Sequence, residues 1–172
     1  MSTLAHTQTP DLQPVTPATG DDGRPRRVLL VEDDADQRGL ITWMLRAQGF
    51  EVLEATSGVE LLAWIGKATS APKSRYFDVI VSDVNMPDLT ALDVLTGWRY
   101  GGWPAPLILV TASADPAVRS EADASGALTV LKKPLQQDEL SQAIARALRA
   151  IRRPAAGSAS LPADPAAPLA GR

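Results

Sequence analysis

The sequence predicts an α/β fold in which helices cover both faces of a parallel sheet. Short apolar runs rich in Val, Ile and Leu recur along the chain, and helical patterns separate them. This alternation predicts parallel pairing, because parallel strands need a crossover connection between them. Four of the runs end in polar residues, so one edge of the sheet should collect charged and hydroxyl side chains.

The first half of the chain contains two of the predicted strands and two of the predicted helices. A first strand is expected at 28–31, and the helix after it should end near Gly49, a typical C-cap residue. A short second strand over 51–55 carries charged residues, as an exposed edge strand does. Ser57 and Glu60 have the spacing of a capping box, which predicts the start of the second helix.

The second half contains the remaining three strands and three helices. Residues 67–75 should form a polar loop, and the apolar run behind it ends as a strand at Asp83. Asp115 followed by Pro116 is typical of an N-cap and a first helical position. The last two strands are expected at 107–110 and 128–131.

Apolar residues at helical spacing predict which helix faces pack against the sheet. We expect Trp43 and Trp64 to belong to packed faces, and the pair Arg26-Arg27 to be exposed at the edge of the domain. The predicted stripes contain Leu40, Ile41, Met44, Leu45, Leu61, Leu62, Ile65, Leu92, Leu95, Trp98, Leu140, Ala143, Ile144, Ala147, Leu148 and Ile151.

Length and local composition define the organisation of the chain. The chain has 172 residues, enough for one ordinary domain with extensions. Residues 1–25 and 154–172 are rich in Pro and small or polar residues and have no hydrophobic periodicity. We therefore expect two disordered tails around one folded domain at 26–153.

The composition argues against several functions. There is no Cys and the one histidine is His6, so thiolate sites, disulfides and a histidine-based catalytic dyad are not expected. The net charge of −3 argues against broad affinity for nucleic acid. No signal peptide is evident, and no apolar run approaches the roughly 20 residues of a membrane helix. We expect a cytoplasmic protein with no membrane partner.

Polar side chains follow the predicted strands at the points where the strands end. They are Glu32 and Asp33 after the first strand, Asp83 at the end of the third, Thr111 after the fourth and Lys133 after the fifth. Clustered carboxylates suit Mg²⁺, which prefers oxygen ligands. An aspartate can attack phosphorus to form an acyl phosphate, while an ammonium and a hydroxyl neutralise charge on the phosphoryl oxygens. The set predicts Mg²⁺-assisted phosphoryl transfer to an aspartate.

These residues lie in segments that resemble the receiver (response-regulator) family. The segments are Val28-Leu-Leu-Val-Glu-Asp33, Val81-Ser-Asp-Val-Asn-Met-Pro87, Val110-Thr-Ala112, Gly126-Ala127 and Lys133-Pro134. The resemblance covers nearly all of the predicted domain. It implies a flavodoxin-like (βα)₅ fold with five parallel strands in the order 2-1-3-4-5.

The resemblance also implies a role for each residue of the site. The family's Mg²⁺-binding acidic pair falls on Glu32 and Asp33, its phosphoacceptor on Asp83, its metal-ligating backbone carbonyl on Asn85, its switch hydroxyl on Thr111 and its phosphate-binding lysine on Lys133. Asp83 also serves as the third metal carboxylate. The Lys-Pro bond of such proteins is usually cis, so a cis bond is expected at Lys133-Pro134.

The sequence departs from the family pattern at two places. Receivers usually carry an aromatic residue or histidine three residues before the lysine, where this chain has Val130. That side chain normally moves inward with the switch hydroxyl, so its absence bears on the coupling of phosphorylation to output. Thr90-Ala91 stands where receivers tend to have Asp-Gly, and we expect a modest change in that loop.

The resemblance implies a response regulator that is phosphorylated on Asp83 by a sensor histidine kinase or a histidine phosphotransfer protein. Because no output domain follows 26–153 in this sequence, output is expected through contacts with an unidentified protein target, without nucleic acid. We expect no enzymatic activity beyond self-phosphorylation and autodephosphorylation.

Two alternatives remain open at this point. The first is a protein-binding module of the same fold that does not depend on phosphorylation, which Val130 favours. The second is a Mg²⁺-dependent phosphatase with an aspartyl nucleophile. Such enzymes usually have a second Asp two residues after the nucleophile, where this chain has Asn85. A P-loop NTPase is disfavoured, because the sequence has no Gly-x-x-x-x-Gly-Lys-Ser/Thr motif.

Overall fold

A computed structural model describes most of the predicted domain. The described residues are 19–20, 23–70, 76–86, 89–98, 105–113, 115–124 and 126–152. Most of the first predicted tail and all of the second lie outside them, as do His6, Pro87 and the side chains of Leu95 and Trp98.

Five parallel strands form one sheet in the order β2-β1-β3-β4-β5, which confirms the predicted flavodoxin-like fold. The strands are β1 Arg27–Val31, β2 Glu51–Ala55, β3 Val79–Asp83, β4 Leu107–Thr111 and β5 Thr129–Lys132. The helices are α1 Ala35–Ala47, α2 Gly58–Ser70, α3 Ala91–Trp98, α4 Pro116–Ala124 and α5 Gln137–Arg152. A helix follows each strand, so every crossover returns the chain to the same edge of the sheet.

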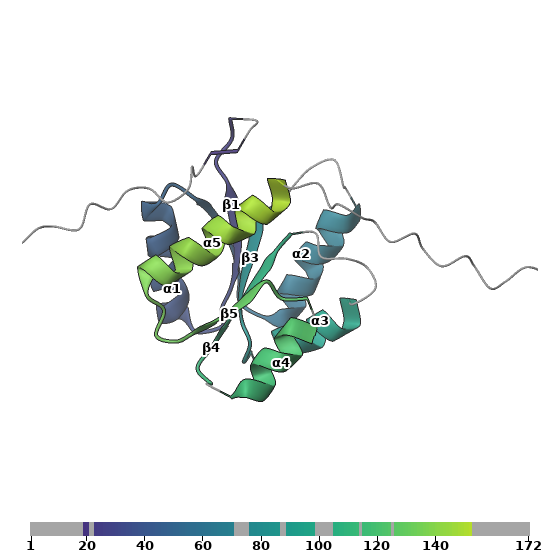
Figure 1. The fold of residues 1–172 in the computed structure, drawn as a ribbon. Helices are drawn as coiled ribbons and strands as arrows, with labels where there is room; N and C mark the ends of the chain where they lie inside the picture. The colour runs from purple at the N-terminus through teal and green to yellow at the C-terminus, as the bar shows by residue number, and fades with distance from the viewer. Residues whose placement is uncertain are drawn as a thin grey trace, which may run out of the picture.

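The helices cover both faces of the sheet (Figure 1). α1 and α5 lie on one face, and α2, α3 and α4 lie on the other. Side chains alternate along a strand, so Val28 and Leu30 of β1 pack toward α1 and α5. Leu29 and Val31 pack toward the other three helices. Because both faces are covered, the central strands are apolar along their length.

Local signals in the sequence set the helix ends. The Asp34 carboxylate accepts from the Gln37 backbone N–H at 2.8 Å, which caps the start of α1. Gly49, just past α1, has a φ of 85°, a left-handed conformation that favours glycine. At the start of α2 the Ser57 hydroxyl accepts from the Glu60 N–H, as the predicted capping box requires, whereas the Glu60 carboxylate accepts from the N–H of Thr56, one residue before the expected position.

Several predictions about the helices are wrong. Helix α2 continues to Ser70, so the predicted loop at 67–75 does not begin at residue 67. Trp43, expected to pack, is 64% exposed, and Leu40 is 53% exposed. Leu62 of α2 is also exposed. Trp64 is partly buried and packs against the core beneath α2, as expected.

A buried ion cluster lies at the amino edge of the sheet. Asp78, just before β3, is fully buried and accepts from the Arg26 guanidinium at 3.0 Å and the Arg27 backbone N–H at 2.8 Å. Arg24 adds an ion pair at 3.3 Å, from a turn within the predicted N-terminal tail. Arg26 is therefore buried and paired, and the expectation that it is exposed is wrong.

Candidate functional site

Three carboxylates meet at the carboxyl edge of the sheet. Glu32 and Asp33 directly follow β1, and Asp83 is the last residue of β3. β1 and β3 are paired neighbours, with Val31 opposite Ser82, so their ends lie side by side. One oxygen from each carboxylate lies within 4.8 Å of the others. Glu32 and Asp83 are buried and Asp33 is exposed, so the cluster opens to solvent on the Asp33 side.

The ammonium of Lys133 joins two of these carboxylates. Its Nζ donates to Oδ2 of Asp83 at 2.6 Å and to Oε2 of Glu32 at 2.8 Å. Burial of Lys133 opposes its charge, but the hydrogen bonds to Asp83 and Glu32 outweigh burial and hold the pKa of the ammonium above its ordinary value. The lysine is therefore a fixed positive charge on the Asp83 carboxylate at neutral pH.

The second oxygen of Glu32 has no hydrogen-bond partner among the residues that the structure describes. Oε1 is buried and accepts no hydrogen bond from the described residues. Burial is the main cause that raises the pKa of Glu32, and the charge of Asp83 adds to it, although Lys133 acts in the opposite direction. A buried oxygen without a donor is costly, and a cation would give it a ligand partner. Glu32, Asp33 and Asp83 therefore fit a metal ion.

Both oxygens of the Asp83 carboxylate are oriented. Oδ2 accepts from Lys133, and Oδ1 accepts from the backbone N–H of Asn85 at 3.0 Å. The Ser82 hydroxyl donates to the Asp83 carbonyl at 3.0 Å, which fixes the backbone at the strand end. The metal-ligand role of the Asn85 carbonyl stays a prediction.

Thr111 ends β4 beside the start of the loop that carries Lys133. The Thr111 side chain is buried, and its hydroxyl oxygen accepts from the Ser113 N–H at 3.0 Å. The Lys133 N–H donates to the Thr111 carbonyl at 2.8 Å, which ties the two loops together. The predicted cis bond at Lys133-Pro134 is confirmed. The structure thus gathers every residue of the predicted site at one edge of the sheet.

The sequence analysis missed Arg38 as a support of the site. Its guanidinium donates to the carbonyls of Glu32 at 2.9 Å and Asp33 at 3.2 Å, so it holds the loop that presents both carboxylates. A signal was present, because Arg38 lies four residues after the Asp34 N-cap and therefore faces back toward this loop.

Gly58 is a second residue that the sequence analysis missed. It is buried at the start of α2, and a Cβ atom there would overlap the backbone carbonyl of Leu89 in the connection between β3 and α3. Glycine is therefore required for this close approach. The connection that follows Asp83 is positioned against the N-terminus of α2.

The chain belongs to the response regulator receiver domain family, whose pattern matches residues 28–145. The cell cycle transcriptional regulator CtrA of Caulobacter vibrioides (strain NA1000 / CB15N) is 32% identical over 74% of this chain and 51% of the relative. The transcriptional regulatory protein FixJ of Bradyrhizobium diazoefficiens is 31% identical over 83% of this chain and 66% of the relative. This chain thus spans about half of CtrA and less than two thirds of FixJ.

Solved receiver structures have the same fold. A response regulator receiver domain protein from Clostridium thermocellum has a TM-score of 0.64 and 26% identity, over 74% of this chain and 97% of that chain. The chemotaxis protein CheY4 of Vibrio cholerae has a TM-score of 0.59 and 33% identity, over 72% of this chain and 98% of that chain. In the described part of this chain, no helix combines the length and apolarity needed to cross a membrane.

Proposed function

We propose that this chain is a phosphoacceptor of a two-component or phosphorelay system and that Asp83 carries the phosphoryl group. The contact of the Lys133 ammonium with both Asp83 and Glu32 supports this most strongly. It puts a fixed positive charge on one oxygen of a buried carboxylate whose other oxygen is oriented by Asn85. That arrangement suits a nucleophile which must accept a highly charged group.

The proposed step moves the phosphoryl group from a phosphohistidine to Asp83. An oxygen of Asp83 attacks phosphorus, and the new O–P bond forms as the donor N–P bond breaks. The electron pair of the broken bond returns to the donor imidazole. Lys133 then pairs with a phosphoryl oxygen, and Thr111 donates its hydroxyl hydrogen to another, so charge spread over these oxygens is neutralised.

Glu32, Asp33 and Asp83 would hold a Mg²⁺ ion, with the carbonyl of Asn85 as a further ligand. When bound, the ion offsets the repulsion between these carboxylates and the incoming phosphoryl group. The buried Oε1 of Glu32, which has no hydrogen-bond donor in the described part of the chain, and the all-oxygen donor set support this assignment.

The proposed donor is a sensor histidine kinase or a histidine phosphotransfer protein, and we place its contact on α1. A groove of about 470 Å³ runs between α1 and the Lys133-Pro134 bond, and Leu40, Met44 and Leu135 line it. Trp43 lies one helical turn along from Leu40 and is also exposed. Lys133 lines this groove and also contacts the Asp83 carboxylate, so a donor bound in the groove would lie near the site.

We further propose that the domain acts on its target through protein–protein contacts in the cytoplasm, without binding nucleic acid itself. The net charge of −3 supports this, because broad affinity for nucleic acid needs a positive surface. Its own chemistry would be limited to self-phosphorylation and autodephosphorylation.

Acetyl phosphate tests the proposal without any partner. Incubation with acetyl phosphate and Mg²⁺ should add one phosphoryl group, detected by intact mass, and Asp83→Asn should abolish the addition. Chelation of Mg²⁺ should abolish it in the unchanged protein. A folded protein that gains no mass under these conditions would contradict the proposal.

A phosphorylation-independent binding module is the second candidate. The half-buried Val130, which leaves a hollow beside Thr111, favours it. The acetyl phosphate experiment distinguishes the two candidates, because a folded protein that gains no mass with Mg²⁺ would favour the phosphorylation-independent module.

A further inference from the structure

A network of charged side chains connects the end of β2 to the loop that follows β1. The Glu54 carboxylate of β2 lies between two arginines of α1, with Oε2 at 3.5 Å from Nε of Arg38 and Oε1 at 3.2 Å from Nη2 of Arg46. The Nη1 group of Arg38 donates to the carbonyls of Glu32 at 2.9 Å and Asp33 at 3.2 Å. A single guanidinium therefore contacts both the carboxylate of the strand and the backbone of the loop.

The sheet fixes the position of Glu54 relative to this loop. Glu54 lies opposite Leu30 in the parallel register, one residue before the end of β2. Because side chains alternate along a strand, it lies on the same face as the buried Val52, which belongs to the core that α1 covers. The next residue, Ala55, accepts the backbone N–H of Glu32 at 3.1 Å. The strand that carries Glu54 is thus hydrogen-bonded to the first residue of the loop.

The Glu54 carboxylate favours one conformation of the Arg38 side chain. A long arginine side chain loses conformational freedom when its guanidinium stays on two carbonyls. The charge of Glu54 offsets that cost, because it attracts the same guanidinium when the side chain reaches the loop. The Arg38 side chain is 19% exposed and that of Arg46 is 60% exposed, so solvent screens the contact of Glu54 with Arg38 less.

The backbone of the loop decides where two of the proposed metal ligands lie. The peptide groups of Glu32 are held on both sides, its N–H by Ala55 and its carbonyl by Arg38. Asp33 is exposed, so packing does little to fix its carboxylate and the direction of its backbone matters more. Mg²⁺ requires ligand oxygens in near-octahedral geometry, so a rotation of this loop would displace them from the ion.

We propose that Glu54 is a positioning residue of the Mg²⁺ site and that it acts through Arg38. The inference rests on the proposed assignment of Glu32 and Asp33 as metal ligands. Glu54 orients the guanidinium that holds the carbonyls of both residues, and its own carboxylate is not among the metal ligands. Residues outside the ligand set commonly tune metal affinity in this way, because they orient the groups that bind the ion.

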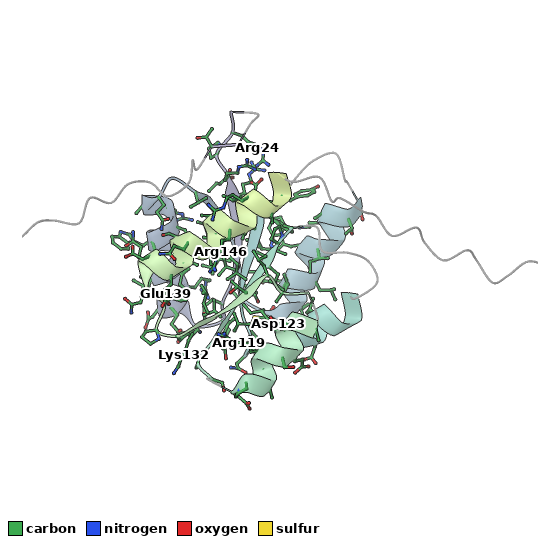
Figure 2. The ribbon with its side chains drawn as sticks, viewed as in Figure 1. Arg24, Arg119, Asp123, Lys132, Glu139 and Arg146 are labelled. Atoms are coloured by element: carbon green, nitrogen blue, oxygen red, sulfur yellow. The ribbon has the colours of Figure 1, made fainter. Side chains whose placement is uncertain are left out.

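Glu51 of the same strand provides a matched control. Its carboxylate pairs with Nε of Arg27 at 2.8 Å and is 44% exposed, close to the 38% of Glu54. Figure 2 shows Arg24, ahead of β1, and Lys132, the last residue of β5, at opposite ends of the molecule. Because the strands are parallel, Glu51 at the start of β2 lies toward the Arg24 end, whereas Glu54 lies toward the metal ligands.

Titration of the unphosphorylated protein with Mg²⁺ tests the inference without a phosphodonor. The dissociation constants follow from backbone amide shifts in NMR spectra. Glu54→Ala should weaken Mg²⁺ binding about two- to fivefold, the effect expected from a partly exposed ion pair, whereas Glu51→Ala should leave it unchanged. Glu54→Gln should retain most of the affinity, because its amide oxygen can still accept from Arg38. Equal dissociation constants for Glu54→Ala and Glu51→Ala would overturn the inference, since both variants lose one negative charge.

A double variant tests whether Glu54 acts through Arg38. Arg38→Met keeps the apolar stem and removes the guanidinium, so Glu54→Ala should cause no further loss of Mg²⁺ affinity in that background. An equal loss in both backgrounds would overturn the proposed route. In the presence of a chelator, Glu54→Ala and Glu51→Ala should lower the urea midpoint to a similar extent, which separates metal affinity from stability.

The same titration distinguishes failure of this inference from failure of the proposed function. If the unchanged protein binds no Mg²⁺, the proposed metal site is wrong and the inference is overturned with it. If the unchanged protein binds Mg²⁺ and Glu54→Ala binds it equally well, the metal site stands and the role of Glu54 alone is overturned.

Discussion

Lys133 and Asp83, 50 positions apart in the chain, meet at 2.6 Å between Nζ and Oδ2. The contact depends on the sheet order, because β3 and β5 each flank β4 and all three strands end at the same edge. A ladder hydrogen bond from the Lys133 N–H to the Thr111 carbonyl fixes the height of the lysine above the sheet.

Replacement of this lysine should slow phosphorylation strongly. Lys133→Met keeps the length of the side chain and removes the ammonium on Asp83. A hydrogen bond to a charged group is worth about 1.5–3 kcal/mol, so labelling by acetyl phosphate should slow about ten- to a hundredfold. Lys132→Met is the matched control, because the exposed Lys132 has no ion pair among the described residues. The rates follow from intact mass against time, and equal rates for the two variants would refute the role of Lys133.

The raised pKa of Glu32 predicts a gain in stability when its charge is removed. The pKa of Glu32 in the folded protein lies above its unfolded value of 4.5. The contribution of Glu32 therefore lowers the free energy of unfolding as pH rises from 4.5 through the folded pKa. Glu32→Gln should therefore raise the free energy of unfolding at pH 7 in the presence of a chelator, as measured by urea titration. Near pH 4 the difference from the unchanged protein should shrink, because Glu32 is then protonated.

The same variant should lose stabilisation by Mg²⁺. A cation that binds only the folded state stabilises that state more as the cation concentration increases. The urea midpoint of the unchanged protein should therefore rise as Mg²⁺ is added. Glu32→Gln should gain less, because one ligand charge is missing. A variant that is both less stable in chelator and equally sensitive to Mg²⁺ would show that Glu32 is a structural residue and no metal ligand.

The close contact of Gly58 with Leu89 predicts opposite effects of one substitution at two positions of α2. Gly58→Ala drives a methyl group into a backbone carbonyl and should cost about 1–3 kcal/mol of unfolding free energy. Gly66→Ala has open space around its Cβ and should stabilise the helix by about 0.5–1 kcal/mol. Chemical denaturation gives both values. Gly58→Ala should also slow acetyl phosphate labelling, since the displaced connection begins at Asp83, whereas Gly66→Ala should leave the rate unchanged.

Removal of the exposed Trp43 side chain of α1 should slow phosphotransfer only when the donor is a protein. Trp43→Ala should slow phosphotransfer from a histidine phosphotransfer protein or kinase, because a large apolar contact is lost beside the groove at Leu40 and Met44. Labelling by acetyl phosphate needs no docking and should be unchanged. Val59→Ala on α2, where Val59 is 61% exposed, is the control and should affect neither rate. A parallel loss of both activities in Trp43→Ala would indicate a folding defect instead of a docking surface.

The carboxylate site could be predicted from the sequence because its residues follow from strand ends. Each of Glu32, Asp83 and Lys133 lies where an apolar run stops, and parallel pairing brings such points to one edge whatever the loops do. The Ser57 cap of α2 was equally local, since it depends on a backbone N–H three residues away, that of Glu60.

Contacts that depend on packing between distant elements could not be predicted. Trp43 continues the apolar stripe of α1, but the helix is rotated so that Ile41 and Leu45 face the sheet and Trp43 faces solvent. Arg26 looked like an exposed charge, because nothing near it in sequence reveals that Asp78, just before β3, lies beside it. Periodicity gives the width of an apolar face, whereas the tertiary fold decides which part of that face is covered.

Removal of the Asp78 charge should lower the stability of the domain without slowing its phosphorylation. Asp78→Asn removes the carboxylate charge that pairs with the buried Arg26 and the partly exposed Arg24. Breaking a buried ion pair on one side typically costs about 3–5 kcal/mol, so the free energy of unfolding should fall by about that amount. Glu51→Gln removes the exposed partner of Arg27 and should cost less than about 1 kcal/mol. Asp78 lies at the amino edge of the sheet, away from Asp83, so below the unfolding transition both variants should accept phosphate from acetyl phosphate at the unchanged rate. The amide oxygen of Asp78→Asn can still accept from the backbone N–H of Arg27. A small loss of stability would therefore mean that this hydrogen bond contributes more to the free energy of unfolding than the two guanidinium groups do.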